Sequence, residues 1–138
     1  MAVMTNKKFV EKCIDVAKNY KTLYVMGGIG YHLTEANKVR AINNGAHGSY
    51  NAKSSRKKMI NAADDNTWAF DCVCFIKAIL WGWRGDKAKS YGGATYLSNG
   101  VPDINADQMI NKCSKVSTDF SKLEVGEVVW LPGHIGVY

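Results

Sequence analysis

Apolar residues recur every three to four positions between residues 6 and 19, and this spacing predicts an amphipathic helix over Asn6–Asn19. Thr5 or Asn6 can cap its first turn with a side-chain oxygen. The segment Thr22–Met26 is predicted to be a short extended run that ends at two glycines. The apolar face of the helix comprises Phe9, Val10, Cys13, Ile14 and Ala17.

The most apolar segment of the chain is Asp71–Trp83, in which Lys77 is the only charged residue after the first position. A helix that is apolar on nearly every side is normally the buried central helix of a domain. Gly82 and Gly85 lie where such a helix would end. The pattern therefore predicts a central helix over Asp71–Trp83.

Shorter segments complete the predicted fold. Helices are predicted near Thr34–Ile42, over Ser55–Ala63 with Ser54 or Ser55 as cap, and over Asp103–Cys113. Strands are predicted at Val128–Leu131 and Ile135–Tyr138, on either side of a Pro132–Gly133 turn. The remainder of Gly30–Ser55 and the turn-rich connection Ser90–Pro102 are predicted to be irregular. Because the helices precede the strands, we expect an α+β fold with the central helix packed on a small antiparallel sheet.

Length and composition fit one globular domain over residues 1–138, since 46% of the residues are hydrophobic and 22% are charged. No apolar run is long enough for a transmembrane helix. Lys7 and Lys8 are not followed by the apolar core of a secretory signal peptide. We therefore expect a protein made in the cytoplasm, which reaches the cell exterior only after release, unless a leader has already been removed.

The formal net charge is +6, and the densest basic cluster comprises Lys53, Arg56, Lys57 and Lys58. Such a cluster can bind nucleic acid, an anionic membrane or an anionic cell-wall polymer, or it can be a solvated helix face. No nucleic-acid-binding motif accompanies it, so we expect no nucleic-acid partner.

Cys72 lies at the predicted start of the central helix. Unpaired N–H groups at a helix N-terminus stabilise a thiolate, which is the nucleophilic form of cysteine. The alternative is a buried structural cysteine. Cys74 should face another side and pack as a small hydrophobic residue, as should Cys13. We expect the four cysteines to be mostly free thiols.

His134 follows the Pro132–Gly133 turn and opens a predicted strand, so its side chain can reach a neighbouring site as a base. A surface histidine at a turn is the alternative. His32 and His47 are predicted loop residues, and Trp130 is the tryptophan expected nearest to the site. The chain has no C-x-x-C pair, H-E-x-x-H motif, P-loop or dinucleotide fingerprint, so we predict no metal and no cofactor.

Three segments together resemble the NlpC/P60 cysteine peptidases. Tyr24–Gly28 (YVMGG) is similar to the Y-x-W-G-G segment of that family, and Phe70–Ile76 (FDCVCFI) to its F-D-C-S-G-L-V nucleophile helix. Leu123–Trp130 (LEVGEVVW) and Gly133–Tyr138 (GHIGVY) together are similar to its L-x-x-G-D-L-V-F and G-H-V-G-I-Y strands. The segments occur in the order of the family and cover most of the chain.

The resemblance implies a papain-like α+β fold and hydrolysis of peptide bonds in the peptidoglycan stem, next to D-glutamate. Cys72 would be the nucleophile and His134 the general base. Tyr24 would help to stabilise the oxyanion, and Asp71 would shape the substrate pocket. The expected partner is bacterial peptidoglycan, reached after release in the manner of a phage or prophage endolysin.

The sequence also departs from the pattern of the family. Val73 and Cys74 replace the usual Ser-Gly, Glu127 replaces an aspartate, and the interval from Gly28 to Phe70 is long enough for a helical insertion. The third polar residue that orients the histidine would follow Tyr138. We therefore expect a domain that lacks its last strands and can self-associate through an exposed sheet edge.

Two alternatives remain for the function. A CHAP-type N-acetylmuramoyl-L-alanine amidase would use the same cysteine and histidine chemistry on a different bond. A catalytically incomplete wall-binding module would keep the fold without the reaction.

Overall fold

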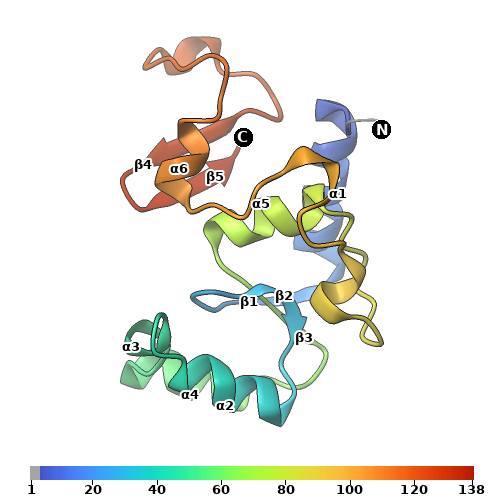
Figure 1. Ribbon diagram of the computed structural model, residues 1–138, viewed down its shortest axis with the longest axis vertical. Helices are drawn as coiled ribbons and strands as arrows, with labels where there is room; N and C mark the ends of the chain where they lie inside the picture. Colours follow the sequence, from blue (N-terminus) through green and yellow to red (C-terminus); the bar gives the residue numbers. More distant parts are fainter. Residues whose placement is uncertain (1–3) are drawn as a thin grey trace.

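A computed structural model describes residues 4–138, and the first three residues of the predicted 1–138 domain lie outside the described part. The described chain forms six α-helices, a three-stranded sheet and a two-stranded hairpin (Figure 1), which confirms the α+β class. The helices are α1 Asn6–Asn19, α2 Glu35–Asn43, α3 Gly48–Asn51, α4 Ser54–Ala62, α5 Cys72–Leu80 and α6 Ala106–Ile110. The strands are β1 Lys21–Tyr24, β2 Ile29–His32, β3 Thr67–Phe70, β4 Val128–Leu131 and β5 His134–Val137.

The three-stranded sheet has β3 at its centre, with β1 parallel and β2 antiparallel to it. Successive side chains of β3 point to opposite faces. Trp68 and Phe70 pack in the core with α1 and α5, whereas Ala69 packs with Leu33 and Ile60 beside α2 and α4. Helices therefore cover both faces of the sheet, as Figure 1 shows.

Helix α5 lies between this sheet and the β4–β5 hairpin (Figure 1). Ile79 of α5, Ile135 of β5 and Met109 of α6 are buried in the same core. The expectation of one small antiparallel sheet is therefore wrong: the antiparallel part is a two-stranded hairpin, and the larger sheet is mixed. The sheet is mixed because β3 pairs parallel with β1 and antiparallel with β2. In the sequence, β2 and three helices lie between β1 and β3, which lets the chain return and run parallel to β1.

Side-chain caps explain where most helices begin. Thr5 accepts a hydrogen bond from the Lys8 amide at the start of α1, and Thr34 caps α2 in the same way. Asn105 forms a capping box with Gln108 on α6. The expected Ser54 or Ser55 cap of α4 is wrong, because Lys53 occupies that position without a side-chain hydrogen bond.

Helix α5 ends at Leu80, three residues before its predicted end, and the chain then folds back on itself. Gly82 has a φ of +88°, and the backbone amide of Trp83 donates to the Ala78 carbonyl. The buried Trp83 ring lies against Gly30, where a Cβ atom would approach its Cδ1 atom to 2.6 Å. Only glycine fits at this position in β2, and Trp83 Nε1 donates to its carbonyl.

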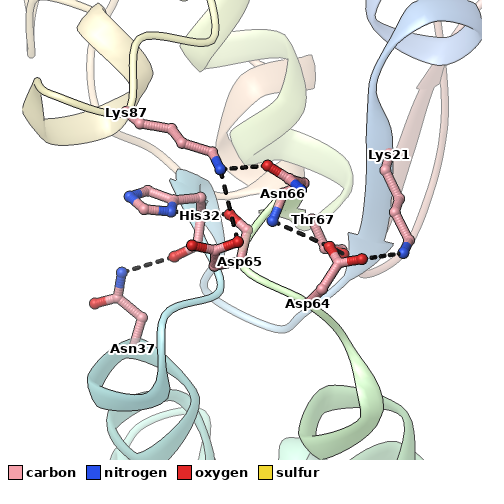
Figure 2. A network of polar contacts seen from close by, with 8 residues as sticks. All are labelled: Lys21, His32, Asn37, Asp64, Asp65, Asn66, Thr67 and Lys87. Atoms are coloured by element: carbon pink, nitrogen blue, oxygen red, sulfur yellow. Dashed lines mark hydrogen bonds and ion pairs between the residues drawn. The ribbon is translucent and has the colours of Figure 1, made fainter.

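A polar loop leads from α4 into β3 (Figure 2). Asp64 Oδ2 is 2.7 Å from Lys21 Nζ, and Asp64 Oδ1 accepts from the amide of Asn66. His32 Nδ1 lies 3.0 Å from the Asp65 carbonyl oxygen. His32 is the last residue of β2 and not the loop residue that we predicted. These contacts fix the entry into β3 and hence the position of the residues that follow it.

Within residues 4–138, none of the helices is both long and apolar enough to cross a bilayer.

Candidate active site

The chain passes from β3 into α5 through Asp71, which caps the helix. Its Oδ1 atom accepts from the Cys74 amide at 2.8 Å, and its Oδ2 atom accepts from the Gly27 amide at 2.9 Å. The buried carboxylate thus joins the turn after β1 to the start of α5. Asp71, which we expected to shape the substrate pocket, thus holds the backbone on either side of Cys72 in place.

Cys72 is the first residue of α5 and is partly exposed. Its backbone amide belongs to the first turn of the helix, where no carbonyl of the same helix can accept from it, and it points toward the Tyr24 phenol. The amide can therefore donate to an oxygen that is bound next to the thiol.

A cavity of about 490 Å³ opens beside Cys72. His134, from the first position of β5, lies on its wall together with Tyr24 and Asp71. Residues far apart in the sequence thus meet at one cavity. The other lining residues are Cys13, Ile14, Ala17, Thr22, Leu23, Phe70, Phe75, Ile76, Ile135, Gly136 and Val137.

Tyr24 keeps its phenol proton at neutral pH. Burial raises the pKa of Tyr24 to about 12, and the neighbouring side chains of Cys72 and Asp71 contribute to the increase. A neutral phenol is a hydrogen-bond donor. Tyr24 can therefore donate to negative charge that develops next to Cys72.

Arg56, from α4, supports Tyr24 from the side of helices α2 to α4. Its guanidinium donates to the Tyr24 carbonyl, and its Cζ atom lies 5.8 Å from the centre of the Tyr24 ring. Tyr50 packs edge-on against Tyr24 with ring centres 6.0 Å apart. Sequence reasoning missed this support, although Arg56 belongs to the basic cluster that the composition identified.

The other three cysteines lie in surroundings that differ from those of Cys72. Cys13 lies on the wall of the same cavity, but burial raises its pKa to about 11, so it stays a neutral thiol. Burial also raises the pKa of Cys74, which packs in the core. Cys113 is partly exposed, and its Sγ atom is 3.6 Å from the Met109 carbonyl oxygen. All four cysteines are free thiols in the structure.

Trp130 does not line the cavity, although we expected it near the site. Its indole Nε1 donates to Asp107 Oδ1 of α6 at 3.0 Å. His47 precedes α3 and lines a separate cavity of about 190 Å³ next to Gly27. In the described part of the chain, no group of three His, Cys, Asp or Glu side chains is placed to hold a metal ion.

Comparisons of the chain with protein families, curated proteins and solved structures give no match. The chemistry available to the cavity is therefore inferred from its own side chains. A thiol at a helix start, an imidazole on the wall of the same cavity and two hydrogen-bond donors are the parts that nucleophilic acyl transfer requires.

Proposed function

We propose that the protein is a cysteine peptidase of the NlpC/P60 type, which hydrolyses a peptide bond in the peptidoglycan stem, next to D-glutamate. The observation that carries the proposal is that Cys72 and His134 line the same cavity from opposite parts of the chain. The three sequence segments that resemble the family supply the substrate class.

The reaction begins when His134 takes the proton of the Cys72 thiol. The thiolate attacks the scissile carbonyl carbon and forms a tetrahedral intermediate. Its oxyanion accepts hydrogen bonds from the Cys72 amide and the Tyr24 phenol. The carbon–nitrogen bond then breaks, and His134 returns the proton to the leaving amine. Water that is deprotonated by His134 hydrolyses the thioester and regenerates the thiol.

Zymography on purified peptidoglycan tests the proposal with the native chain, Cys72→Ala, His134→Ala and the matched control Cys113→Ala. Clearing by the native chain and Cys113→Ala, but not by the other two variants, is the expected result. Equal clearing by the native chain and Cys72→Ala would overturn the nucleophile assignment.

The released fragments identify the bond that is cut. Mass spectrometry should find new termini within the stem peptide. A free lactyl group on the glycan would instead indicate the amidase reaction of the CHAP type. Cosedimentation with peptidoglycan without any clearing would indicate a wall-binding module.

A further inference from the structure

The turn that carries His134 has a backbone conformation that hairpins seldom use. Leu131 and His134 pair across the two-residue connection Pro132–Gly133. Gly133 has a φ of +78°, and proline followed by a glycine with positive φ is the signature of a type II turn. Two-residue hairpins favour the mirror-image turns, whose twist matches that of the strands. This turn therefore needs support from outside the hairpin.

Asp107 of α6 provides that support. Its Oδ1 atom accepts from the Gly133 amide at 2.8 Å and from Trp130 Nε1 at 3.0 Å. One oxygen thus binds a donor within the turn and a donor on the strand that precedes it. Helix α6 is itself fixed to the core through the buried residues Ala106 and Met109.

We propose that Asp107 is a positioning residue for His134, in an inference that rests on the proposed function. An isolated two-stranded hairpin is marginally stable, and His134 is exposed at its end. Fixing the Gly133 amide fixes the backbone of the next residue, His134, and thereby the approach of its imidazole to Cys72. The role needs an oxygen acceptor at position 107, and an asparagine can supply one.

The experiment compares Asp107→Ala with the near-isosteric Asp107→Asn in the full chain. In Asp107→Ala, amide exchange at Gly133 should accelerate roughly tenfold or more, because a hydrogen bond to a carboxylate is lost. NMR relaxation should show greater mobility of the His134 ring. The Gly133 exchange rate in Asp107→Asn should stay within about threefold of the rate in the native chain. Trp130→Phe removes only one of the two donors to Asp107, so its Gly133 exchange rate should lie between those of the native chain and Asp107→Ala.

Two functional readouts separate positioning from general destabilisation. Peptidoglycan hydrolysis by Asp107→Ala should fall roughly ten- to hundredfold, with KM nearly constant, because the base is displaced. The pH profile of Cys72 alkylation should move toward that of His134→Ala, whereas Asp107→Asn should restore the native profile. If Asp107→Ala does not fold, Asp107→Asn and Trp130→Phe carry the same comparison.

An unchanged His134 ring mobility in Asp107→Ala would overturn the inference, as would an Asp107→Asn variant that behaves like Asp107→Ala. Failure of the proposed function is a separate outcome. A native chain that cuts no peptidoglycan would contradict the function. Gly133 exchange and His134 mobility would still decide whether Asp107 holds the histidine.

Discussion

The phenol of Tyr24 stays protonated well above neutral pH, because burial raises its pKa to about 12 with further contributions from Cys72 and Asp71. Tyr24→Phe removes the donor and keeps the ring that packs against Tyr50. We expect kcat to fall about ten- to hundredfold with little change in KM, because the lost hydrogen bond acts on the oxyanion. Steady-state kinetics on a soluble stem peptide measure both constants. A change confined to KM would assign Tyr24 to substrate binding instead.

Arg56 stabilises the same tyrosine through its backbone and its ring. Arg56→Met keeps an unbranched side chain but removes the charged donor to the Tyr24 carbonyl and the cation over the Tyr24 and Tyr50 rings. We expect the free energy of unfolding to fall by about 1–3 kcal/mol. The matched control is Lys57→Met, at the exposed position that follows Arg56 in α4. Lys57→Met should change the free energy of unfolding by less than about 0.5 kcal/mol. Urea unfolding compares the two, and equal losses would contradict a specific role for Arg56.

The sequence was sufficient to predict some residues at the site and not others. Cys72 could be chosen because a helix start and an apolar run are local patterns, and Tyr24 and His134 because they lie in recognisable segments. Arg56 reaches the Tyr24 carbonyl from 32 positions away, and Asp107 reaches Gly133 from 26 positions away. Such contacts depend on the path of the segments between the elements, for which hydrophobic periodicity carries no information.

At the scale of elements, a partly buried ion pair joins α5 to the connection that follows it. Lys77 Nζ lies 2.5 Å from Asp103 Oδ1, and the Tyr96 hydroxyl donates to Asp103 Oδ2 at 2.8 Å. Burial alone would raise the pKa of Asp103, but the hydrogen bonds from Lys77 and Tyr96 outweigh it and lower the pKa below its ordinary value of 3.8. The folded state therefore binds this proton less readily than the unfolded state does.

This difference makes the contribution of Asp103 to stability depend on pH. The contribution is fully present above about pH 4 and is lost as the pH falls through the lower pKa of the folded state. We expect the Tm of the native chain to fall more steeply between pH 5 and about pH 2 than the Tm of Asp103→Asn. Calorimetry over this range measures both slopes. Parallel slopes would mean that Asp103 has the same pKa in the folded and unfolded states.

The pattern predicted elements with a clear local signal better than elements without one, and strand β4 has its predicted bounds. Helix α1 has its predicted bounds and a predicted cap, Thr5, because its periodicity extends over four turns. Strand β3 was missed because all four of its residues are buried, so its pattern does not alternate and merges with that of α5. Strand β2 was missed because its glycine and histidine resemble a loop. Helix α6 begins later than the predicted helix Asp103–Cys113, because Asn105 caps it from within that range.

At the scale of the whole molecule, exposed positive charge gathers at two separate places, around the start of α4 and at the start of α1. The cluster formed by Lys53, Arg56, Lys57 and Lys58 takes part in no salt bridge within residues 4–138. In contrast, Lys21, Lys38 and Lys77 are each paired with a carboxylate. Figure 1 shows α4 far from the N-terminal end of α1, where Lys7 and Lys8 are also exposed. The chain thus offers two lysine pairs at separate places on its surface.

We expect the basic cluster to strengthen adsorption to an anionic cell-wall polymer, because its member Arg56 contacts Tyr24, which lines the cavity. Lys57→Glu combined with Lys58→Glu should weaken cosedimentation with purified cell walls more than Lys7→Glu combined with Lys8→Glu, which changes the net charge equally. Adsorption of the native chain should fall as salt rises, since charges more than about 10 Å apart are screened at 0.1 M ionic strength. Equal losses in the two double variants would show that only the net charge of +6 matters. Salt-independent adsorption would instead indicate that apolar or hydrogen-bonded contacts hold the chain to the wall.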